Sequence, residues 1–381
     1  MSTASASYQL PDLLPLFQDN YELRINKHCR SASLASENWI QTLDFPSTAR
    51  NGLPDKKLGL LAACCFPTCD LNQLTLVMDL WTLIVVDTET LLRSKQVPAL
   101  FIQDFRADSK PGFVELTKAH ILFKHLSLRL SQLKSSTSES WQQRFSASMS
   151  SYMDAKRRGA EHQAEGNRIP LEIDDYIKFR RNLSGIELIL DMIEAVEGLE
   201  LDISFYGEEL HALRRVTAEI ICLTWDVFSY NIDQSVGNTI NIVSLLRSSR
   251  KFSLSSAVQQ AGTMIRDRIT RFKALENALL VKIQTSTYST DTNASTTPTT
   301  SWLWNVVSSS RAPQAKDPGQ ALTETQAHDI ALYTRGLNDL VIGFLNWAYE
   351  TDMFFGTKGD AVKGFGWVFL LPAYSLTRSS T

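Results

Sequence analysis

The sequence has few of the features that mark membrane, secreted or nucleic-acid-binding proteins. No apolar run approaches the ~20 residues that a membrane-spanning helix needs. The N-terminal stretch MSTASASYQLPDLLPLF lacks the charged start and apolar core of a secretory signal. The formal net charge is −3, whereas a nucleic-acid-binding domain usually carries a basic face. We therefore expect a cytoplasmic protein that neither inserts into a membrane nor binds nucleic acid.

The cysteines and the basic residues do not form an obvious site either. Three of the 5 cysteines crowd into CCFPTC at 64–69, without the second Cys or His pair that a zinc site requires. Disulfides are not expected without a secretory signal. The densest basic run is KRR at 156–158, which is typical of a solvated loop or helix end.

Strand signals are scarce, and most of the chain has the apolar spacing of helices. Long helical segments are predicted within 71–94, 140–166, 173–201, 206–235, 254–283 and 326–355. Gly185 interrupts the third of these and is expected to break or bend it. Residues 286–301 are rich in Ser and Thr, and 307–320 resemble a linker, so 286–320 is expected to be a flexible segment or lid. The prediction is a single all-α domain, a large helical bundle over residues 1–381.

The stretch WDVFSYNIDQS at 225–235 places polar side chains in an otherwise apolar helix. Because each residue turns an α-helix by about 100°, Asp226, Ser229 and Asp233 fall within roughly 60° of one another. Two carboxylates and a hydroxyl on one face suit a hard cation such as Mg²⁺. The same pattern is also typical of Asp residues that cap the helix or pair with neighbouring Lys or Arg.

Two further features have both a functional and a structural interpretation. Asp87 continues the apolar stripe of its helix, whereas Glu89 lies about 200° away, so Asp87 is either a metal ligand at a cavity mouth or a surface residue. Two adjacent arginines, Arg180 and Arg181, precede Gly185, and the guanidinium fork suits phosphate oxygens. The alternative is a solvated Arg pair.

Aromatic residues are frequent and could line a cavity that tolerates a carbocation, because ring faces attract cations. Plain core packing accounts for most aromatic residues in any bundle. The residues that we predict to line such a cavity are Trp81, Phe179, Trp225, Phe344 and Trp347.

Several ordered segments together resemble the fungal class I terpene synthases over nearly the whole chain. They are YELRINKHCRSASLASENWI, LGLLAACCFPTCDLNQLTLVMDLWTLIVVD, YIKFRRNLSG, WDVFSYNIDQSVGNTINIV and FLNWAYETDMFFG. The resemblance implies an all-α fold around an apolar cavity. In that family three Mg²⁺ ions hold a prenyl diphosphate and trigger loss of diphosphate, which leaves a carbocation to cyclise. Metal ions and arginines neutralise the leaving group, and a dry pocket keeps water from the cation.

The sequence departs from the family pattern at both metal motifs. The first motif normally reads Asp-acid-x-x-acid, whereas DTETL keeps Asp87 and has Thr88 and Leu91 in place of the other acids. The second motif normally supplies Asn, Ser and Glu at four-residue steps. Here these positions hold Trp225, Ser229 and Asp233, with Asp226 beside the first of them. The metal ligands implied by the resemblance are therefore Asp87, Ser229 and Asp233. With so few ligands, the site is expected to hold fewer than three Mg²⁺ ions, or none.

The diphosphate contacts of the family are also only partly present. Matched through Gly185, the arginine that senses diphosphate falls on Arg181, with Arg180 beside it. A basic residue often precedes the last acid of the second motif, and here it is Ile232. The C-terminal Arg-Tyr pair is replaced by Met353 and Phe354.

These features leave three hypotheses for the function. The first is a divergent terpene cyclase, a carbon–oxygen lyase of terpenoid biosynthesis that acts on a prenyl diphosphate, with farnesyl diphosphate the expected substrate. The second is an enzyme of the same fold that isomerises or cyclises a neutral terpenoid or polyene without metal. The third is a non-catalytic relative that binds a prenyl ligand or a partner enzyme.

Overall fold

The computed structural model describes residues 7–18, 21–42, 52–90, 126, 129–130, 133, 136–165, 172–201, 203–288 and 323–372. Within these ranges the side chains of 18, 86–90, 160, 163–165, 203–206 and 285–288 are not described. Most of the segment expected to be flexible, 289–320, therefore lies outside the described residues.

The described chain is almost entirely helical, which confirms the all-α prediction. The helices are α1 (Pro15–Gln18), α2 (Cys29–Gln41), η1 (Pro54–Lys56), α4 (Leu58–Cys65), α5 (Leu71–Thr90), α8 (Glu139–Glu165), α9 (Ile173–Leu183), α10 (Ile186–Glu197), α11 (Ile203–Ser235), α12 (Ile242–Ser249), α13 (Leu254–Tyr288), α15 (Glu324–Glu350), α16 (Asp352–Phe355), η4 (Gly356–Lys358) and α17 (Gly359–Phe365). The strands β1 (Ser7–Gln9) and β2 (Trp367–Phe369) pair antiparallel and join the two ends of the chain. No helix in the described ranges is long and apolar enough to cross a membrane.

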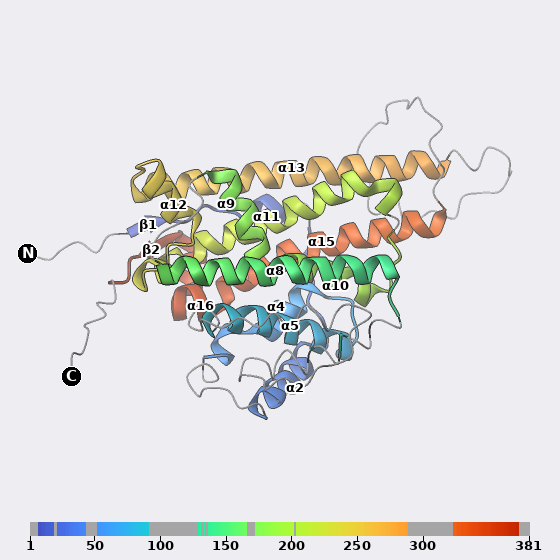
Figure 1. Cartoon of the computed structure of the whole chain (residues 1–381), viewed down its shortest axis with the longest axis horizontal. Helices are drawn as coiled ribbons and strands as arrows, with labels where there is room; N and C mark the ends of the chain where they lie inside the picture. Colours follow the sequence, from blue (N-terminus) through green and yellow to red (C-terminus); the bar gives the residue numbers. More distant parts are fainter. Residues whose placement is uncertain are drawn as a thin grey trace, which may run out of the picture.

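Helix α11 lies at the centre of the bundle. It packs against α13, α15, α10, α9 and α12, while α15 packs along α4 and α8 packs along α9 and α10. In Figure 1, α13, α11, α15 and α8 run along the long axis, and α4, α5 and α2 lie in the lower part of the molecule. Residues of α11 therefore meet side chains from several helices at once.

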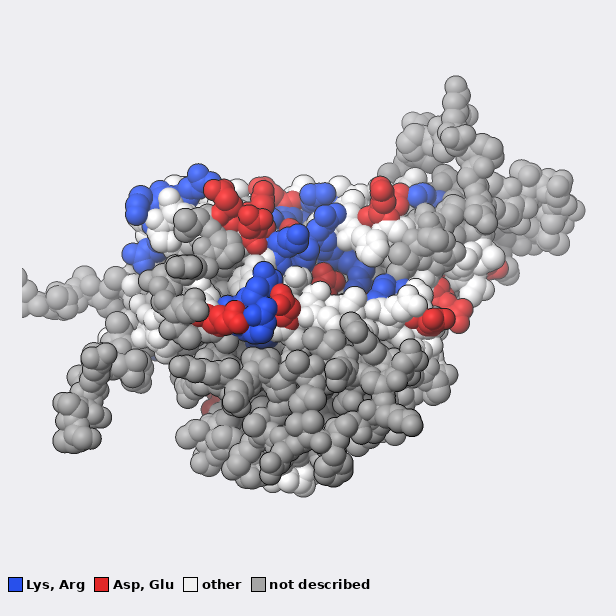
Figure 2. Space-filling model, in the orientation of Figure 1, with Lys and Arg blue, Asp and Glu red and all other residues white. Residues whose placement is uncertain are grey.

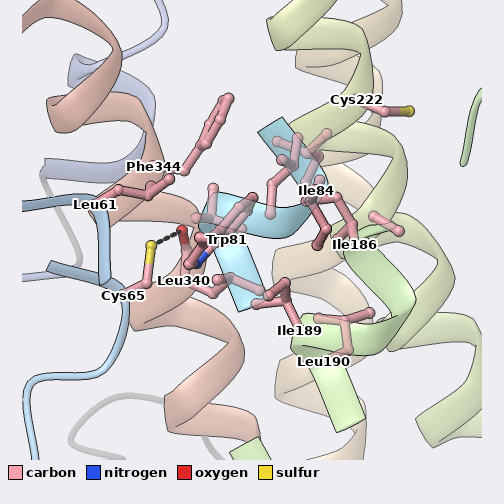
Figure 3. Packing of buried hydrophobic residues seen from close by; sticks show 14 of the residues in the cluster. Leu61, Cys65, Trp81, Ile84, Ile186, Ile189, Leu190, Cys222, Leu340 and Phe344 are labelled. Atoms are coloured by element: carbon pink, nitrogen blue, oxygen red, sulfur yellow. Dashed lines mark hydrogen bonds between the residues drawn. The ribbon is translucent and has the colours of Figure 1, made fainter. Parts of the chain in front are cut away.

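The core between α4, α5, α10 and α15 is apolar and closely packed. Figure 3 shows Trp81 and Ile84 of α5 lying between Leu340 and Phe344 of α15 and the apolar face of α10. A Cβ on Gly343 would lie 2.5 Å from the Cys64 carbonyl, so this glycine permits the close approach of α15 and α4. Such close packing gives each of these helices a fixed position relative to the others.

The predicted break between α9 and α10 is confirmed at Gly185. Its φ of 69° is in the left-handed region, which glycine adopts at no steric cost. A Cβ at this position would meet Ile84 at 3.0 Å and Tyr152 at 3.1 Å. The break therefore requires glycine both for its backbone conformation and for space between α5 and α8.

The prediction of one continuous helix to Phe355 is wrong, because α15 ends at Glu350. Thr351 has extended backbone, and its hydroxyl accepts a hydrogen bond from the backbone N–H of Met353 and caps α16. The same hydroxyl donates to the Lys56 carbonyl oxygen at 3.0 Å. Side-chain capping of this kind competes with helix continuation, and the apolar pattern alone does not report it.

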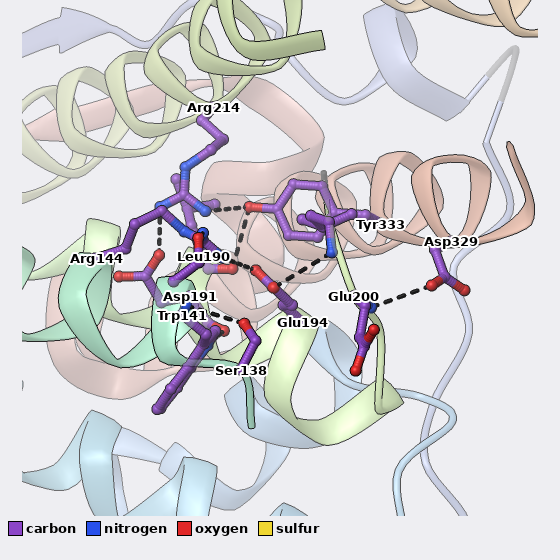
Figure 4. A network of polar contacts seen from close by, with 12 residues as sticks. Ser138, Trp141, Arg144, Leu190, Asp191, Glu194, Glu200, Arg214, Asp329 and Tyr333 are labelled. Atoms are coloured by element: carbon purple, nitrogen blue, oxygen red, sulfur yellow. Dashed lines mark hydrogen bonds and ion pairs between the residues drawn. The ribbon is translucent and has the colours of Figure 1, made fainter. Parts of the chain in front are cut away.

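A buried polar network ties four helices together away from the pocket described below (Figure 4). Arg214 of α11 donates to Asp191 of α10 at 2.6 Å and also to the Tyr333 hydroxyl of α15. Trp141 of α8 donates its indole N–H to the Asp191 carbonyl oxygen at 2.7 Å. Since each buried charge has a partner of the opposite sign, the network fixes the relative positions of these helices.

Candidate active-site pocket

A pocket lies between α5, α8, the α9–α10 break and α11, and the turn after α11 forms its edge. Its polar lining residues are Lys156, Arg180, Ser184, Ser229, Asp233 and Asn238. Its apolar lining residues are Ile84, Leu183, Ile186, Ile221, Cys222, Trp225 and Ile240. The pocket thus combines two cationic side chains with a mainly aliphatic wall.

Arg180 is held at this pocket by Asp226. The Arg180 Nε donates to Asp226 Oδ1 at 2.7 Å, and the Tyr176 hydroxyl donates to the other carboxylate oxygen. The backbone N–H of Ile242 also donates to Asp226, at 2.9 Å. Burial and the nearby carboxylate raise the pKa of Tyr176 well above its usual value, so the hydroxyl keeps its proton. Asp226 therefore acts as an acceptor for α9 and α12, and both its oxygens are used.

Ser229 and Asp233 form a second cluster one turn further along α11. The Ser229 hydroxyl donates to Asp233 at 2.6 Å, and the side-chain amides of Asn238 and Asn241 each donate to Asp233 at 2.9 Å. Burial raises the pKa of the Asp233 carboxyl, although these hydrogen bonds lower it. The carboxyl is thus satisfied by neighbours of the protein itself.

The described residues do not fit the three-ion cluster that the family resemblance implies. Of the second motif only Ser229 and Asp233 lie together, and amide donors occupy both oxygens of Asp233. Among the described residues no three His, Cys, Asp or Glu side chains come together as a metal-binding group. Asp87 lies in α5, but its side chain is outside the described residues, as is Leu91. Magnesium prefers several oxygen ligands, and the part of the site described here supplies two.

Trp225 occupies the first ligand position of the second motif and is part of an aromatic cluster. Its ring stacks on Phe344 with centroids 5.8 Å apart, lies 5.9 Å from Trp347, and meets Phe354 edge-on at 5.4 Å. Trp225 lines the pocket, whereas Phe344, Trp347 and Phe354 lie behind it in the core. At the position where the resemblance implies an oxygen ligand, this chain therefore has a fixed aromatic ring.

The structure places the other predicted cavity residues outside the pocket lining. Trp81 is fully buried in the core (Figure 3), and the Arg158 guanidinium lies over the Phe179 ring, 5.3 Å from its centroid. Met353 packs against the core beside Phe354. Of the five predicted cavity aromatics, only Trp225 borders the described pocket.

The two adjacent arginines separate at the end of α9. Arg180 borders the pocket, whereas Arg181 pairs with Glu219 at 3.3 Å and Glu187 at 3.6 Å. Gly185 follows them at the break, as the sequence predicted. The structure thus brings Arg180, Ser229 and Asp233 together at one pocket and turns Arg181 toward neighbouring carboxylates.

Sequence reasoning missed Lys156. The run KRR was interpreted as solvated, which is confirmed for Arg157 and Arg158 and wrong for Lys156, which is 2% exposed and lines the pocket. Helical spacing gives the signal that would have found it, because Lys156 continues the stripe of the buried Met149 and Tyr152.

Comparisons with known proteins agree with this fold. Residues 91–271 match the family model described as terpene synthase family 2, C-terminal metal binding. A sesquiterpene synthase, Agr1, of Cyclocybe aegerita is 26% identical over 96% of this chain and 94% of its own length. Alpha-muurolene synthase of Coprinopsis cinerea is 24% identical over 96% of this chain and 78% of its own.

Solved structures show the same fold at lower identity. An α-eudesmol synthase covers 87% of this chain and 97% of its own with a TM-score of 0.68 at 17% identity. A hedycaryol synthase in complex with nerolidol has a TM-score of 0.66 at 20% identity and covers 89% and 100% of the two chains.

Over nearly its whole length the chain is therefore similar to fungal sesquiterpene synthases, and its fold is that of the solved terpene synthases, which confirms the resemblance seen in its sequence. Because these relatives are synthases, the comparisons support a terpene synthase-like lyase. The matched family description implies use of a divalent metal.

Proposed function

We propose that the protein is a terpene cyclase that acts on a prenyl diphosphate, with farnesyl diphosphate as its substrate. The observation that carries this proposal is the pocket, in which the cationic Lys156 and Arg180 border the same space as the aromatic face of Trp225. A prenyl diphosphate has a charged head and an apolar chain, so it matches both parts. The proposal includes the cytoplasmic location expected from the sequence.

The residues of this chain support two parts of the reaction. Arg180 is fixed through its Nε by Asp226, which leaves the rest of its guanidinium to offset the charge of departing diphosphate. The aliphatic wall, with Trp225, would exclude water that quenches a carbocation, and the ring face would stabilise the cation electrostatically. The described residues do not fit the three-ion cluster of the family. The experiment below therefore tests whether the reaction of this chain requires Mg²⁺.

A second candidate is a metal-independent enzyme of the same fold that isomerises or cyclises a neutral terpenoid. The observation that favours it is the pair of changes at the second motif, where Trp225 fills one ligand position and neighbouring amides satisfy Asp233. A related synthase is known in complex with nerolidol, an uncharged alcohol. Such a ligand would occupy the apolar part of the pocket without needing a diphosphate site.

The deciding experiment incubates the pure protein with farnesyl diphosphate in Mg²⁺ and in chelator, and measures both diphosphate release and volatile products. Hydrocarbon or alcohol products with equimolar diphosphate support the cyclase, and their loss in chelator establishes the metal requirement. Turnover of farnesol or a polyene in chelator, with no diphosphate released from farnesyl diphosphate, supports the second candidate. Binding of either probe without turnover refutes both.

The variant Arg180→Met tests whether the described pocket is the site of the reaction. We expect diphosphate release to fall about 10- to 100-fold, the size of a lost charge-assisted hydrogen bond. Arg181→Met is the matched control, because the neighbouring arginine pairs with carboxylates instead of bordering the pocket. If the two variants lose activity equally, this pocket does not hold the diphosphate.

A further inference from the structure

We propose that the end of the molecule formed by β2 and the α12–α13 turn is a docking surface for an anionic lipid membrane, on which the protein lies without spanning it. The apolar part of this surface is an exposed stripe, which consists of Trp367, Phe369 and Leu371. The basic part is the α12–α13 turn with Arg250 and Lys251. The surface lies outside the pocket, and its partner differs from the substrate of the proposed function.

The exposed stripe lies on the outer face of β2 and of the residues that follow it. Trp367, Phe369 and Leu371 are 50%, 59% and 41% exposed, whereas Val368 is 4% exposed. Such alternation usually turns apolar residues inward and polar residues toward solvent. Here the outward residues are apolar as well, and Phe365, which precedes them in the chain, is 74% exposed. A group of large exposed apolar residues marks a surface that binds a partner.

The chemistry of the stripe fits the surface of a lipid bilayer. Trp, Phe and Leu are the apolar residues with which interfacial segments enter the boundary between lipid headgroups and acyl chains. Because alternate side chains of an extended strand project to the same side, the three side chains of the stripe can enter one flat boundary together. A flat, apolar and non-directional partner therefore suits this face of β2.

Positive charge lies at the same end of the molecule and makes the preferred membrane anionic. Residues 234–266 include four basic residues and no Asp or Glu. Of these, Arg250 and Lys251 are exposed at the α12–α13 turn, next to the exposed Phe252. Figure 2 shows Lys and Arg side chains gathered over α12 at the left end of the molecule. The negative surface potential of anionic lipids attracts basic residues placed in this way.

A chain of contacts holds the basic turn and the exposed stripe at one end of the bundle. Tyr8 of β1 pairs with Val368 of β2, and its ring meets that of Tyr230 edge-on at 5.8 Å. The Tyr230 hydroxyl accepts a hydrogen bond from Arg247 of α12 at 2.6 Å. β1 also packs against α13, and α12, β1 and β2 lie at the same end in Figure 1. One membrane surface can therefore contact both parts.

The C-terminal turns of α11 connect the docking surface to the pocket. Asn231 donates to the Phe369 carbonyl oxygen at 3.0 Å and accepts from the Leu371 N–H at 2.8 Å. Gln234 donates to the Leu371 carbonyl oxygen at 2.8 Å. Asp233 lines the pocket from the same turns. Docking would bring the edge of the pocket near the membrane, where an apolar product of the proposed function leaves water for lipid.

Flotation of the full chain with vesicles tests the exposed stripe. The vesicles contain phosphatidylcholine with phosphatidylserine, and thermal unfolding confirms that each variant is folded. Trp367→Ser and Phe369→Ser should each weaken binding about 10-fold, the effect of no longer burying one large apolar side chain. Leu34→Ser is the matched control and should bind like the wild type, because Leu34 is 52% exposed but belongs to α2, away from β2 in Figure 1.

The double variant Arg250→Gln with Lys251→Gln tests the charge. It should weaken binding to vesicles with phosphatidylserine about 10- to 25-fold, since each basic residue contributes about fivefold at an anionic surface. On phosphatidylcholine alone, the wild type and the double variant should bind equally weakly. Lys27→Gln with Arg30→Gln is the matched control, because both residues are exposed near the start of α2.

Three results would overturn the proposal. The first is a wild type that binds vesicles with phosphatidylserine no better than phosphatidylcholine alone, and the second is wild-type binding by Trp367→Ser and Phe369→Ser. The third is a dimer, seen by sedimentation velocity without lipid, that Trp367→Ser disrupts while the wild type binds no vesicles; the stripe would then bind a second copy of the chain. None of these measurements depends on turnover, so the proposed function is tested separately.

Discussion

Replacing Asp226 by Asn separates two interpretations of the second metal motif. Asp226 shares a helix face with Ser229 and Asp233, which suggested a metal ligand, but in the structure it accepts hydrogen bonds from Tyr176 and Arg180 and from one backbone N–H. The change keeps the shape of the side chain and removes its charge. It should therefore affect the position of Arg180 and leave any bound metal untouched.

The expected cost follows from burial and from the number of lost contacts. Asp226 is 1% exposed and the Arg180 side chain 11%, so Arg180 would keep a buried charge without its partner. Removing one partner of such a pair costs about 3–5 kcal/mol. The side-chain N–H₂ group of Asn would also lie opposite one of the hydrogen-bond donors, Arg180 or Tyr176, so Asn cannot replace the lost interaction. We therefore expect the free energy of unfolding to fall by about 3–5 kcal/mol, a large part of the usual total.

Urea unfolding of the two single variants, Asp226→Asn and Arg180→Met, and of the double variant completes a thermodynamic cycle. The coupling energy should be about 1.5–3 kcal/mol, the value of a hydrogen bond to a charged group. Asp175→Asn is the matched control, because Asp175 is exposed on α9 and its loss should change stability by less than about 0.5 kcal/mol. Diphosphate affinity should fall in Asp226→Asn, while Mg²⁺ affinity measured without diphosphate should not.

The reasoning fails if Asp226→Asn has wild-type stability and loses Mg²⁺ binding. That result would make Asp226 a metal ligand, and its hydrogen bonds to α9 would then contribute little. Zero coupling with Arg180 would likewise show that the arginine is positioned by other contacts.

Three further substitutions test buried polar groups in the helical bundle and the glycine at the α9–α10 break. Arg214→Met should lower the free energy of urea unfolding by about 3–5 kcal/mol, because it leaves Asp191 buried without its partner; a loss under 1 kcal/mol would contradict this. Burial raises the pKa of Asp79 from 3.8 to about 6, so its contribution to stability is largest at acidic pH and is lost as the pH rises through 6. The unfolding free energy of the wild type minus that of Asp79→Asn should accordingly fall by about 2 kcal/mol between pH 4 and pH 7, and a flat difference would refute the shift. Gly185→Ala should destabilise by roughly 1–2 kcal/mol or more, since a Cβ adds left-handed strain and approaches Tyr152 at 3.1 Å; unchanged thermal unfolding would show that the α9–α10 break tolerates it.

The helices could be predicted from the sequence because their signal is local. Apolar spacing at 3.6 residues identified α8, α11 and α13, and the glycine between α9 and α10 marked the break. The end of α15 could not be predicted in this way. It depends on a hydroxyl of Thr351 that bonds to η1, which is almost three hundred residues earlier in the chain.

The site was predicted less completely, for a related reason. Ser229 and Asp233 are one turn apart, so helical spacing alone was enough to bring them together. Asp226 satisfies the same angular rule, but its orientation is decided by Arg180 and Tyr176 on another helix. The pattern of one helix contains no information about which neighbouring helix its polar residues meet. For the same reason, the sequence could not show that Arg180, and not Arg181, borders the pocket.

The two departures from the family pattern at Trp225 and Phe354 lie far apart in the sequence, but the two side chains are in contact in the structure. The two rings meet edge-on at 5.4 Å, and Phe344 and Trp347 complete the cluster. Returning Trp225 to Asn alone would leave a cavity against Phe354 and place an amide among rings, at a cost of about 3–5 kcal/mol for the lost bulk alone. Returning Phe354 to Tyr alone would add a hydroxyl to a ring that is 1% exposed and packed in this aromatic cluster. Because each aromatic residue stabilises the other, the loss of an oxygen ligand at one motif and the loss of a polar side chain at the other reinforce one another. Under the proposed function, a diphosphate in this pocket would then take its positive charge from basic residues outside these two positions, and Arg180 borders the pocket in the described part of the chain.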